Sequence, residues 1–532
     1  MGAVRVSHLS WRLPDGSALL RDIGFTVGDG DRVALVGANG AGKTTLLSLI
    51  AGDLTPSEGT ISVDGRLGVM RQLAFHAHTS RGWTVHDLLV SLAEPQLQSA
   101  SAHLRAAESN VEADPIGYAH ALAAWGDAGG YRAEVHWDEC AMRAVGKPFN
   151  EIAARPIATF SGGEQKRIAL EVLLHGEADV LLLDEPDNFL DVAAKRWLER
   201  ELVATRKTVL FVSHDRELLN ATATKIVTVE AARGVGGGAW THGGRFATYA
   251  EARRAHLDKL ERDRAHYDLE RKRLEDLVAE MRRRAKISDT FAPKLKAAES
   301  KLRQFVARSE RPADVREQRI AMRLGGARTG RRALIVERLE LDGLTDPFDL
   351  EIDFGERVAV LGPNGAGKSH FLRLLAGDVS VEHHGSFRLG AGVVPGLFHQ
   401  THEHPDWRAR TPVEILHRHD VVRGPAMPML RRYEIHGCAD QPFETMSGGQ
   451  QARFQILLLE TGGATMLLLD EPTDNLDLVS AEALQDGLAA FTGTVIAVTH
   501  DRWFLRGFDR FVVFAADCSV TDHLTVPALW AS

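Results

Sequence analysis

The sequence predicts an α/β protein in which two phosphate-binding domains of one design flank a long α-helical hairpin. Three observations support this prediction. A loop of the form Gly-x-x-x-x-Gly-Lys-Ser/Thr occurs twice, each time between a strand pattern and a helical pattern. Further motifs repeat in the same order after each loop. Between the two copies lies a charged stretch, residues 251–332, with the spacing of a helical hairpin.

The two glycine-rich loops indicate nucleotide binding. Residues 37–44 form the first loop and residues 362–369 the second. The glycines let backbone N–H groups surround phosphates at a helix N-terminus. Lys43 is therefore expected to reach the terminal phosphates, and the hydroxyl of Thr44 is expected to ligate Mg²⁺.

The repeat extends well beyond these loops. Three further pairs of motifs are each separated by 286 residues. They are the Ser-Gly-Gly sequences beginning at Ser161 and Ser447, the Asp-Glu pairs beginning at Asp184 and Asp470, and the histidines His214 and His500. An internal repeat that keeps its register over more than 50 residues indicates two copies of one domain.

The Asp-Glu pairs are the predicted catalytic carboxylates. Each pair follows an apolar run such as 180–183, which predicts a buried parallel strand ending at the site. Phosphoryl transfer to water mainly requires positioning and neutralisation of charge. Glu185 and Glu471 are placed to polarise the attacking water. His214 and His500 are expected to contact the γ-phosphate.

This set of motifs resembles the ATP-binding cassette (ABC) superfamily, over roughly residues 4–230 and 333–515. Both halves match the P-loop, Q-loop, signature, Walker B strand with its glutamate, D-loop and switch histidine. Two cassettes in one chain, no apolar run of 18 residues and a charged helical linker are together similar to the ABC-F family, whose members act on ribosomes. Gly243–Tyr249 also resembles the aromatic entry of an ABC-F linker.

The resemblance implies two ABC-type P-loop ATPase domains joined by a long α-helical hairpin linker. The expected domains are 1–240, with a helical insertion over about 83–155, then the linker 241–332 and the second cassette 333–532. Each ATP would lie between the P-loop of one half and the signature of the other. ATP binding would close the halves, and hydrolysis would release them.

ATP and Mg²⁺ are the expected cofactors. In the first half the expected binding residues are Trp11, Gly37, Asn39, Gly40, Gly42, Lys43, Thr44, Thr45, Gln72, Ser161, Gly162, Gly163, Asp184 and Asp191. In the second half they are Gly362, Asn364, Gly365, Gly367, Lys368, Ser369, His370, Gln400, Ser447, Gly448, Gly449, Asp470 and Asp477. Those expected near Mg²⁺ are Thr44, Gln72, Asp184, Ser369, Gln400 and Asp470.

Some positions depart from the family's pattern. Neither D-loop keeps the commoner Thr-Asn-His-Leu-Asp, but Asp191 and Asp477 remain, so hydrolysis is expected in both halves. Trp11 stands where an aromatic stacks on adenine, whereas residues 339–346 of the second half contain no aromatic. Ordinary core packing of Trp11 is the alternative. His370 stands where Thr is usual, and nothing in the sequence explains it.

An insertion enlarges the first cassette. Gln72 and Gln400 are 328 residues apart, so 42 extra residues lie between Gln72 and Ser161. ABC-F proteins carry an arm at this place. Residues 81–155 contain 6 Lys/Arg and 10 Asp/Glu, which argues against RNA as the main contact and favours a protein or intramolecular surface. An insertion without any partner is the alternative.

The linker is basic in an acidic chain. Residues 251–332 contain 24 Lys/Arg and 14 Asp/Glu, whereas the whole chain has a net charge of −9. Most of the excess follows Met281, which favours a polyanionic partner. Apolar positions recur at intervals of three and four from Leu260 to Met281 and again from Leu295 to Phe305. A solvated spacer is the alternative.

The break between the two predicted helices contains their expected boundaries. Ser288, Asp289 or Thr290 can cap the second helix, and Pro293 suits its first turn. Pro312 is expected to end that helix.

The resemblance implies an ATPase that binds the ribosome through the linker, with rRNA and, as a further candidate, tRNA as contacts. ATP binding and hydrolysis would insert and withdraw the linker near the tRNA or peptidyl-transferase region. The protein would act as a translation factor or in antibiotic-resistance ribosome protection. The short tip, with Ile287 and Phe291 as its only large apolar groups, slightly favours a translation factor.

Two other classes of protein share parts of this pattern. An ATP-binding subunit of a membrane exporter would have no use for the basic linker. A DNA-maintenance ATPase with a zinc clasp is excluded by the wide separation of Cys140, Cys438 and Cys518. A cytoplasmic monomer with intramolecular cassette pairing and no membrane insertion is therefore expected.

Overall fold

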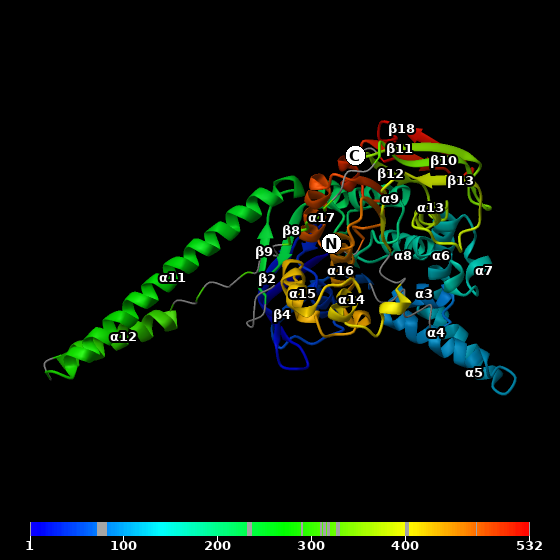
Figure 1. Ribbon diagram of the computed structural model, residues 1–532. Helices are drawn as coiled ribbons and strands as arrows, with labels where there is room; N and C mark the ends of the chain where they lie inside the picture. Colours follow the sequence, from blue (N-terminus) through cyan, green and yellow to red (C-terminus); the bar gives the residue numbers. More distant parts are fainter. Residues whose placement is uncertain are drawn as a thin grey trace.

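The computed structural model describes residues 2–71, 82–230, 237–288, 291–308, 311, 315, 320–325, 330–399, 404–474 and 476–530. Gln72 and Gln400, predicted to bind nucleotide and Mg²⁺, lie outside these residues, as do Asp289, Thr290 and Pro312. The predicted α/β class with two similar domains and a helical linker is confirmed (Figure 1).

Each cassette is built on a six-stranded sheet that is parallel except at one edge. In the first cassette the order is β5 (Leu67–Met70), β6 (Val180–Asp184), β7 (Thr208–Val212), β3 (Arg32–Val36), β8 (Lys225–Val229) and β9 (Ala239–His242). In the second it is β14 (Pro395–Phe398), β15 (Met466–Asp470), β16 (Thr494–Val498), β12 (Arg357–Leu361), β17 (Arg510–Phe514) and β18 (Val520–His523). The identical order confirms that the sequence repeat is a structural repeat.

A three-stranded antiparallel sheet accompanies each six-stranded sheet. It is formed by β2 (Ala18–Val27), β1 (Ala3–Arg12) and β4 (Glu58–Asp64) in the first cassette, and by β11 (Phe348–Asp353), β10 (Arg332–Leu341) and β13 (His383–Leu389) in the second. The apolar runs of the parallel strands are buried on both faces because this layer covers one face and helices cover the other. Leu182 of β6 belongs to the core beneath β1 and β2, whereas Leu181 and Leu183 belong to the core beneath the helices.

The strands end where the chemical motifs begin. α1 (Lys43–Ala51) follows β3, and α13 (Lys368–Leu375) follows β12. The signature sequences begin α8 (Gly162–His175) and α16 (Gly448–Thr461), and Ser161 and Ser447 cap these helices through a capping box. The D-loops begin α9 (Val192–Ala204) and α17 (Leu478–Ala490), which Asp191 and Asp477 cap.

The helical part of the first cassette is larger than that of the second. It contains α3 (Val85–Leu92), α4 (Pro95–Glu108), α5 (Pro115–Asp127), α6 (Gly130–Val145) and α7 (Phe149–Ile152), whereas the second has α14 (Pro412–Arg418) and α15 (Arg423–Arg432). The additional α4–α5 pair projects away from the cassette (Figure 1). Trp125 and Trp137 are almost fully buried where this insertion meets the core.

The linker is a long antiparallel helical hairpin that extends from the cassettes (Figure 1). We call α11 (Tyr249–Ala285), α12 (Ala292–Arg308) and the residues between them the basic hairpin. At 1.5 Å per residue, the 37 residues of α11 span roughly 56 Å. The predicted seam is present, because Val278 and Ala298 are buried and the rings of Tyr267 and Phe305 lie 5.0 Å apart.

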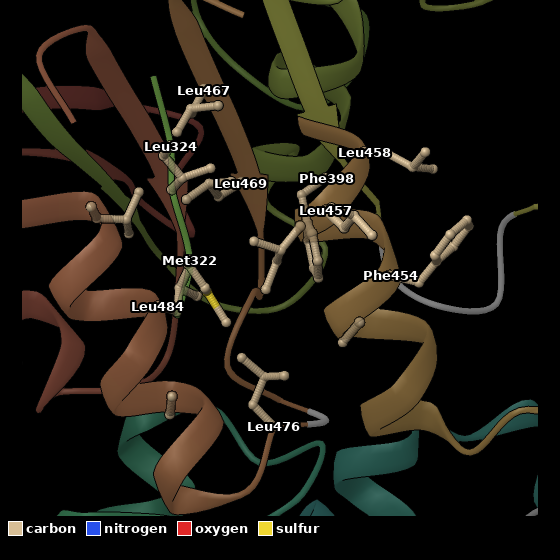
Figure 2. Packing of buried hydrophobic residues seen from close by; sticks show 14 of the residues in the cluster. Met322, Leu324, Phe398, Phe454, Leu457, Leu458, Leu467, Leu469, Leu476 and Leu484 are labelled. Carbon is tan, nitrogen blue, oxygen red and sulfur yellow. The ribbon is translucent and has the colours of Figure 1, made fainter. Parts of the chain in front are cut away.

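The chain returns from the basic hairpin into the core of the second cassette. Arg311 donates hydrogen bonds of 2.9 and 2.8 Å to the carboxylate of Asp268 on α11. Beyond it, Met322 and Leu324 are 9% and 8% exposed and lie beside Leu484, Leu467 and Leu469 (Figure 2). We call residues 320–325 the return segment. It is a structural part of the second cassette, although the sequence pattern assigned it to the linker.

The return segment contributes to the stability of the second cassette. Truncation of a buried leucine costs about 2–5 kcal/mol, because apolar contacts are lost and a cavity remains. We expect Leu324→Ala to lower the unfolding temperature by several degrees in differential scanning calorimetry. Val306→Ala, at a side chain 51% exposed on α12, is the control and should change it little. Equal effects of the two substitutions would contradict the buried position of Leu324.

Candidate functional site

The two P-loops have the same local geometry. Gly37 and Gly362 have φ angles of 151° and 148°, and a Cβ at these positions would lie 2.4 and 2.1 Å from the carbonyl oxygens of Val229 and Phe514. Only glycine allows this approach of two backbone segments. The loops are therefore held against the strands β8 and β17, with the N-termini of α1 and α13 directly behind them.

Each P-loop lysine lies over its own loop. Lys43 Nζ donates to the carbonyl oxygens of Gly37 and Ala38 at 2.8 and 3.1 Å. Lys368 Nζ donates to Gly362 at 2.8 Å and to the following residue at 2.7 Å. Burial lowers the pKa of both lysines, while carboxylates at the ends of β6 and β15 oppose that effect. The two lysines are thus enclosed cations positioned for a polyanionic ligand.

Both predicted catalytic glutamates adopt a left-handed backbone conformation. The φ angles are 49° at Glu185 and 46° at Glu471. Their backbone N–H groups donate to Val212 and Val498, each at 3.0 Å, which fixes the strand ends in the same way. A strained backbone at a residue other than glycine is common at functional sites. Its occurrence at both members of the pair supports a functional role for these side chains.

The environments of the two glutamates favour proton transfer near neutral pH. Burial, followed by Asp184 and Asp187, raises the pKa of Glu185 to about 7. Burial, followed by Asp474 and Asp470, raises the pKa of Glu471 to about 8. A general base works best when its pKa lies near the working pH. A cation bound beside these carboxylates would lower both values.

The switch histidines are neutral and lie next to the P-loop lysines. Burial lowers the pKa of His214 to about 3 with help from Lys43, and that of His500 to about 3 with help from Lys368. The backbone N–H of His500 donates to Glu471 Oε2 at 3.0 Å, and the ring nitrogen Nε2 of His500 lies 3.1 Å from Asn364 Oδ1. A neutral imidazole there can donate one hydrogen bond to a phosphate oxygen.

The second site is assembled from both halves of the chain. A cavity of about 360 Å³ is lined by Ser161 to Gly163 of the first signature and by the second P-loop, within the usual size of ligand pockets. His370, Asp470, Glu471 and His500 also line it. The arrangement of a P-loop facing the other half's signature therefore agrees with the expectation for this site.

A contact across the same interface marks the first site. The backbone N–H of Asn39 in the first P-loop donates to Asp477 Oδ2 of the second D-loop at 3.1 Å. The corresponding Asp191 of the first D-loop lies close enough to Lys368 to act on its charge. Each D-loop thus approaches the P-loop of the opposite half.

The residues expected near Mg²⁺ suit that ion where they are described. The carboxylate of Asp184 is hydrogen-bonded to the Thr44 side chain, and its Oδ1 is buried without a hydrogen-bond partner among the described residues. The described residues include no cluster of three or more His, Cys, Asp or Glu that could hold a metal ion. Mg²⁺ is usually held by one or two carboxylates together with phosphate oxygens and water. A hydroxyl and one carboxylate in each half fit that chemistry.

Trp11 is half-buried at the end of β1 and packs against the core that contains Leu9 and Leu20. The second cassette differs here. His8 in β1 and Arg338 in β10 both have a positive φ angle and mark equivalent places in the two strands. Trp11 and Leu341 each lie three residues further on, so they correspond, and Leu341 is fully buried. Adenine stacking on Trp11 stays a prediction, and the structure shows that part of the Trp11 side chain packs against the core.

Sequence reasoning missed several polar residues around the site. Lys166 Nζ donates to the carbonyl oxygen of Glu185, and Asn188 Nδ2 donates to its carboxylate at 2.6 Å. Lys195 lines the second site. Lys166 and Lys195 lie on helix faces that are otherwise buried. Such a cation on an apolar helix face is the signal that could have identified them.

Ion pairs join the two cassettes beside these sites. Arg502 pairs with Glu199, and Arg506 Nη2 lies 2.7 Å from Glu217 Oε1. Arg216 donates to Gln485 Oε1 at 2.7 Å. The interface is therefore polar and charged, as expected for surfaces that separate and meet again.

Comparison with known proteins agrees with this geometry. The ABC transporter family profile matches residues 20–188 and 345–474. An antibiotic resistance protein of Mycobacteroides abscessus is 50% identical over 98% of this chain and 99% of its own. The tylosin resistance ATP-binding protein TlrC of Streptomyces fradiae is 30% identical over 92% of this chain and 93% of its own. ATP-binding cassette sub-family F member 3 of mouse is 32% identical over 90% and 66%, respectively.

Solved structures share the fold. An archaeal ribosome recycling factor, aABCE1, in complex with the ribosomal stalk protein aP1, has a TM-score of 0.55 at 20% identity and covers 95% of this chain and 87% of its own. RNase-L Inhibitor has a TM-score of 0.57 at 18% identity, with coverage of 95% and 87%.

The chain belongs to the ATP-binding cassette superfamily and, within it, to the ABC-F family. It is an ATPase with two ATP-binding domains. None of the helices in the described part of the chain has the length and apolar character needed to span a membrane.

The paired glutamates generate the first prediction about hydrolysis. Glu185→Gln together with Glu471→Gln should leave ATP binding intact, because the P-loops and signatures are unchanged. Phosphate release should fall by about 10²–10⁴-fold if the carboxylates act as general bases. Glu139→Gln, at an exposed residue of α6, is the control and should turn over normally. Turnover of the double variant within threefold of the parent would refute the assignment.

Proposed function

We propose that this ATPase binds the ribosome through its basic hairpin when ATP and Mg²⁺ close the two cassettes, and that it thereby protects translation from a ribosome-targeting antibiotic. The observation that carries the proposal is a basic helical hairpin between the two cassettes of an otherwise acidic ATPase, joined to the second cassette through the return segment. The ribosome offers the matching partner, because its RNA presents a dense array of phosphates.

The tip of the basic hairpin is suited to contacts with nucleic acid. The side chains of Arg282 and Arg284 are 62% and 52% exposed. Their ion pairs with Glu299 and Glu280 are solvent-exposed, and such pairs contribute little, so phosphates can replace the carboxylates. Phe291 lies at the same tip with the cations of Arg284 and Lys294 over its ring, and an aromatic side chain in a basic surface can stack on an unpaired base.

The base of the basic hairpin supports coupling to the nucleotide sites. Tyr249 begins α11, and its hydroxyl lies 3.0 Å from Thr228 Oγ1 on β8. The ring of Trp240 on β9 stacks on His256 at 4.7 Å. The hairpin therefore starts against the first cassette, and the return segment that follows it lies in the core of the second. Closure and opening of an intramolecular cassette pair would move the hairpin relative to at least one of them.

The names of relatives favour the resistance role over a general translation factor. The relative that is 50% identical is described as an antibiotic resistance protein, and TlrC as a tylosin resistance protein. From sequence alone, the short tip of the hairpin slightly favoured a translation factor. We give more weight to identity over nearly the whole chain, because the tip is only a few residues of it. The ribosomal contact would lie near the tRNA or peptidyl-transferase region.

Reversal of charge at the tip tests ribosome binding. Arg282, Arg283 and Arg284 changed together to Glu should abolish ATP-dependent co-sedimentation with ribosomes, measured with the hydrolysis-deficient double variant. Each lost phosphate contact should reduce the slope of log affinity against log salt by roughly 0.7–0.9. Basal ATPase activity in the hydrolysis-competent chain should persist.

The matched control reverses Arg254, Lys259 and Arg262, which are exposed near the base of α11 and give the same change of net charge. This control should retain most of the binding. If the tip variant keeps the parental affinity and salt slope, the basic hairpin is a spacer and the proposal is wrong.

Cell-free translation separates the two roles. With tylosin present, the parent protein and ATP should restore peptide synthesis, whereas the tip variant should not. Stimulation of synthesis without the drug, and no protection with it, would instead assign the protein as a translation factor. Synthesis unaffected under either condition would contradict both roles.

A further inference from the structure

One buried lysine in the cassette interface has no role in the motifs described above. Lys195 lies on α9, one turn after the first D-loop, and is 8% exposed. Its Nζ lies 3.0 Å from Asp215 Oδ2. Lys195 also lines the second nucleotide site beside Asp187 of the first D-loop and Asp474 of the second. A cation in this position contacts the elements that connect the two sites.

The surroundings of Lys195 are strongly acidic and come from both halves of the chain. Burial alone would lower its pKa, but four carboxylates outweigh that effect and hold the pKa above its ordinary value. They belong to Asp215 and Asp187 of the first cassette and to Asp474 and Asp501 of the second. The ammonium group therefore remains charged in the closed pair and neutralises carboxylates on both sides of the interface.

Few other positively charged side chains act on the four carboxylates. Arg502 acts on Asp215, Arg216 acts on Asp501, and Lys166 acts on Asp187. Arg502 is itself paired with Glu199. Asp187 Oδ1 is buried without a hydrogen-bond partner among the described residues. Without Lys195, the buried carboxylates would therefore be left with too little positive charge.

The internal repeat shows that this arrangement is asymmetric. Asp215 and Asp501 are counterparts, because each follows a switch histidine and the two are 286 residues apart. The counterpart of Lys195 by the same spacing is Ala481, a buried residue of α17. Two equivalent aspartates, one in each half, therefore share a single lysine, because the second half has an alanine at the corresponding position.

We propose that Lys195 is a positioning residue that couples the two ATP sites by holding both D-loops in the closed cassette pair. Asp474 lies in the same turn as Asp477, whose carboxylate accepts from Asn39 in the first P-loop. Asp187 lies in the turn that lines the second site. A cation shared by these turns makes the geometry of one site depend on the other. Charge removal therefore weakens closure, whereas binding to a single P-loop is unaffected.

The test uses the full-length ATPase without ribosomes, so its outcome is independent of the proposed role in translation. In Lys195→Met the ATP concentration for half-maximal phosphate release should rise at least tenfold. Lys195→Arg, which keeps the charge, should stay within threefold of the parent. ADP binding should change by less than twofold in both variants, because ADP lacks the γ-phosphate through which the halves are expected to close.

A compensating substitution distinguishes charge balance from a general packing defect. Asp474→Asn in the Lys195→Met background removes one of the carboxylates and should recover at least threefold of the lost ATP response. If Lys195→Met does not fold, the double variant is compared with Asp474→Asn alone, and a difference below threefold is expected. An unchanged ATP response in Lys195→Met, an equal loss of ADP binding, or no recovery in the double variant would overturn the proposal.

Discussion

Both nucleotide sites depend on carboxylates and lysines that are forced together in a buried interface. In each half a parallel strand covered on both faces ends there with an aspartate, such as Asp184 of β6, and the glutamate follows at the edge of the sheet. Burial, and after it the neighbouring carboxylates, raises the pKa of both glutamates, and nearby lysines oppose that effect only in part. A bound cation would relieve this excess of negative charge, whereas nucleotide phosphates would pair with the buried P-loop lysines.

In the proposed function, the same interface would link hydrolysis to movement of the hairpin. Each D-loop approaches the opposite P-loop, as shown by the contact of Asn39 with Asp477. The basic hairpin leaves the first cassette at Tyr249, and the return segment after it enters the core of the second cassette at Met322. Any change in the distance between the two cassettes would therefore also move the linker that joins them. Under the proposed function, the position of the charged tip would therefore depend on events at Glu185 and Glu471.

The sequence predicted the fold, and it pointed to many of the residues that the structure brings together at the second site, because both have local signals. The glycines of the P-loops, the strand before Asp470 and the heptad spacing around Tyr267 each have a signature within a few residues. Lys195 and the return segment have no such signature. The partners of Lys195 include Asp474 and Asp501, which lie 279 and 306 residues away in the sequence. From sequence alone Met322 was assigned to the linker, because the apolar residues that it contacts lie in helices and strands of the second cassette.

The return segment also has a consequence for how the chain is made. Synthesis proceeds from the N-terminus, so Met322 and Leu324 leave the ribosome before the strands and helices that will enclose them. The second cassette therefore matures around a segment already tethered to the finished first cassette. A fragment beginning at residue 333 would lack these side chains and would leave Leu484 and Gly487 uncovered. The folding unit of the second cassette therefore includes the return segment as well as the strands and helices from β10 onward.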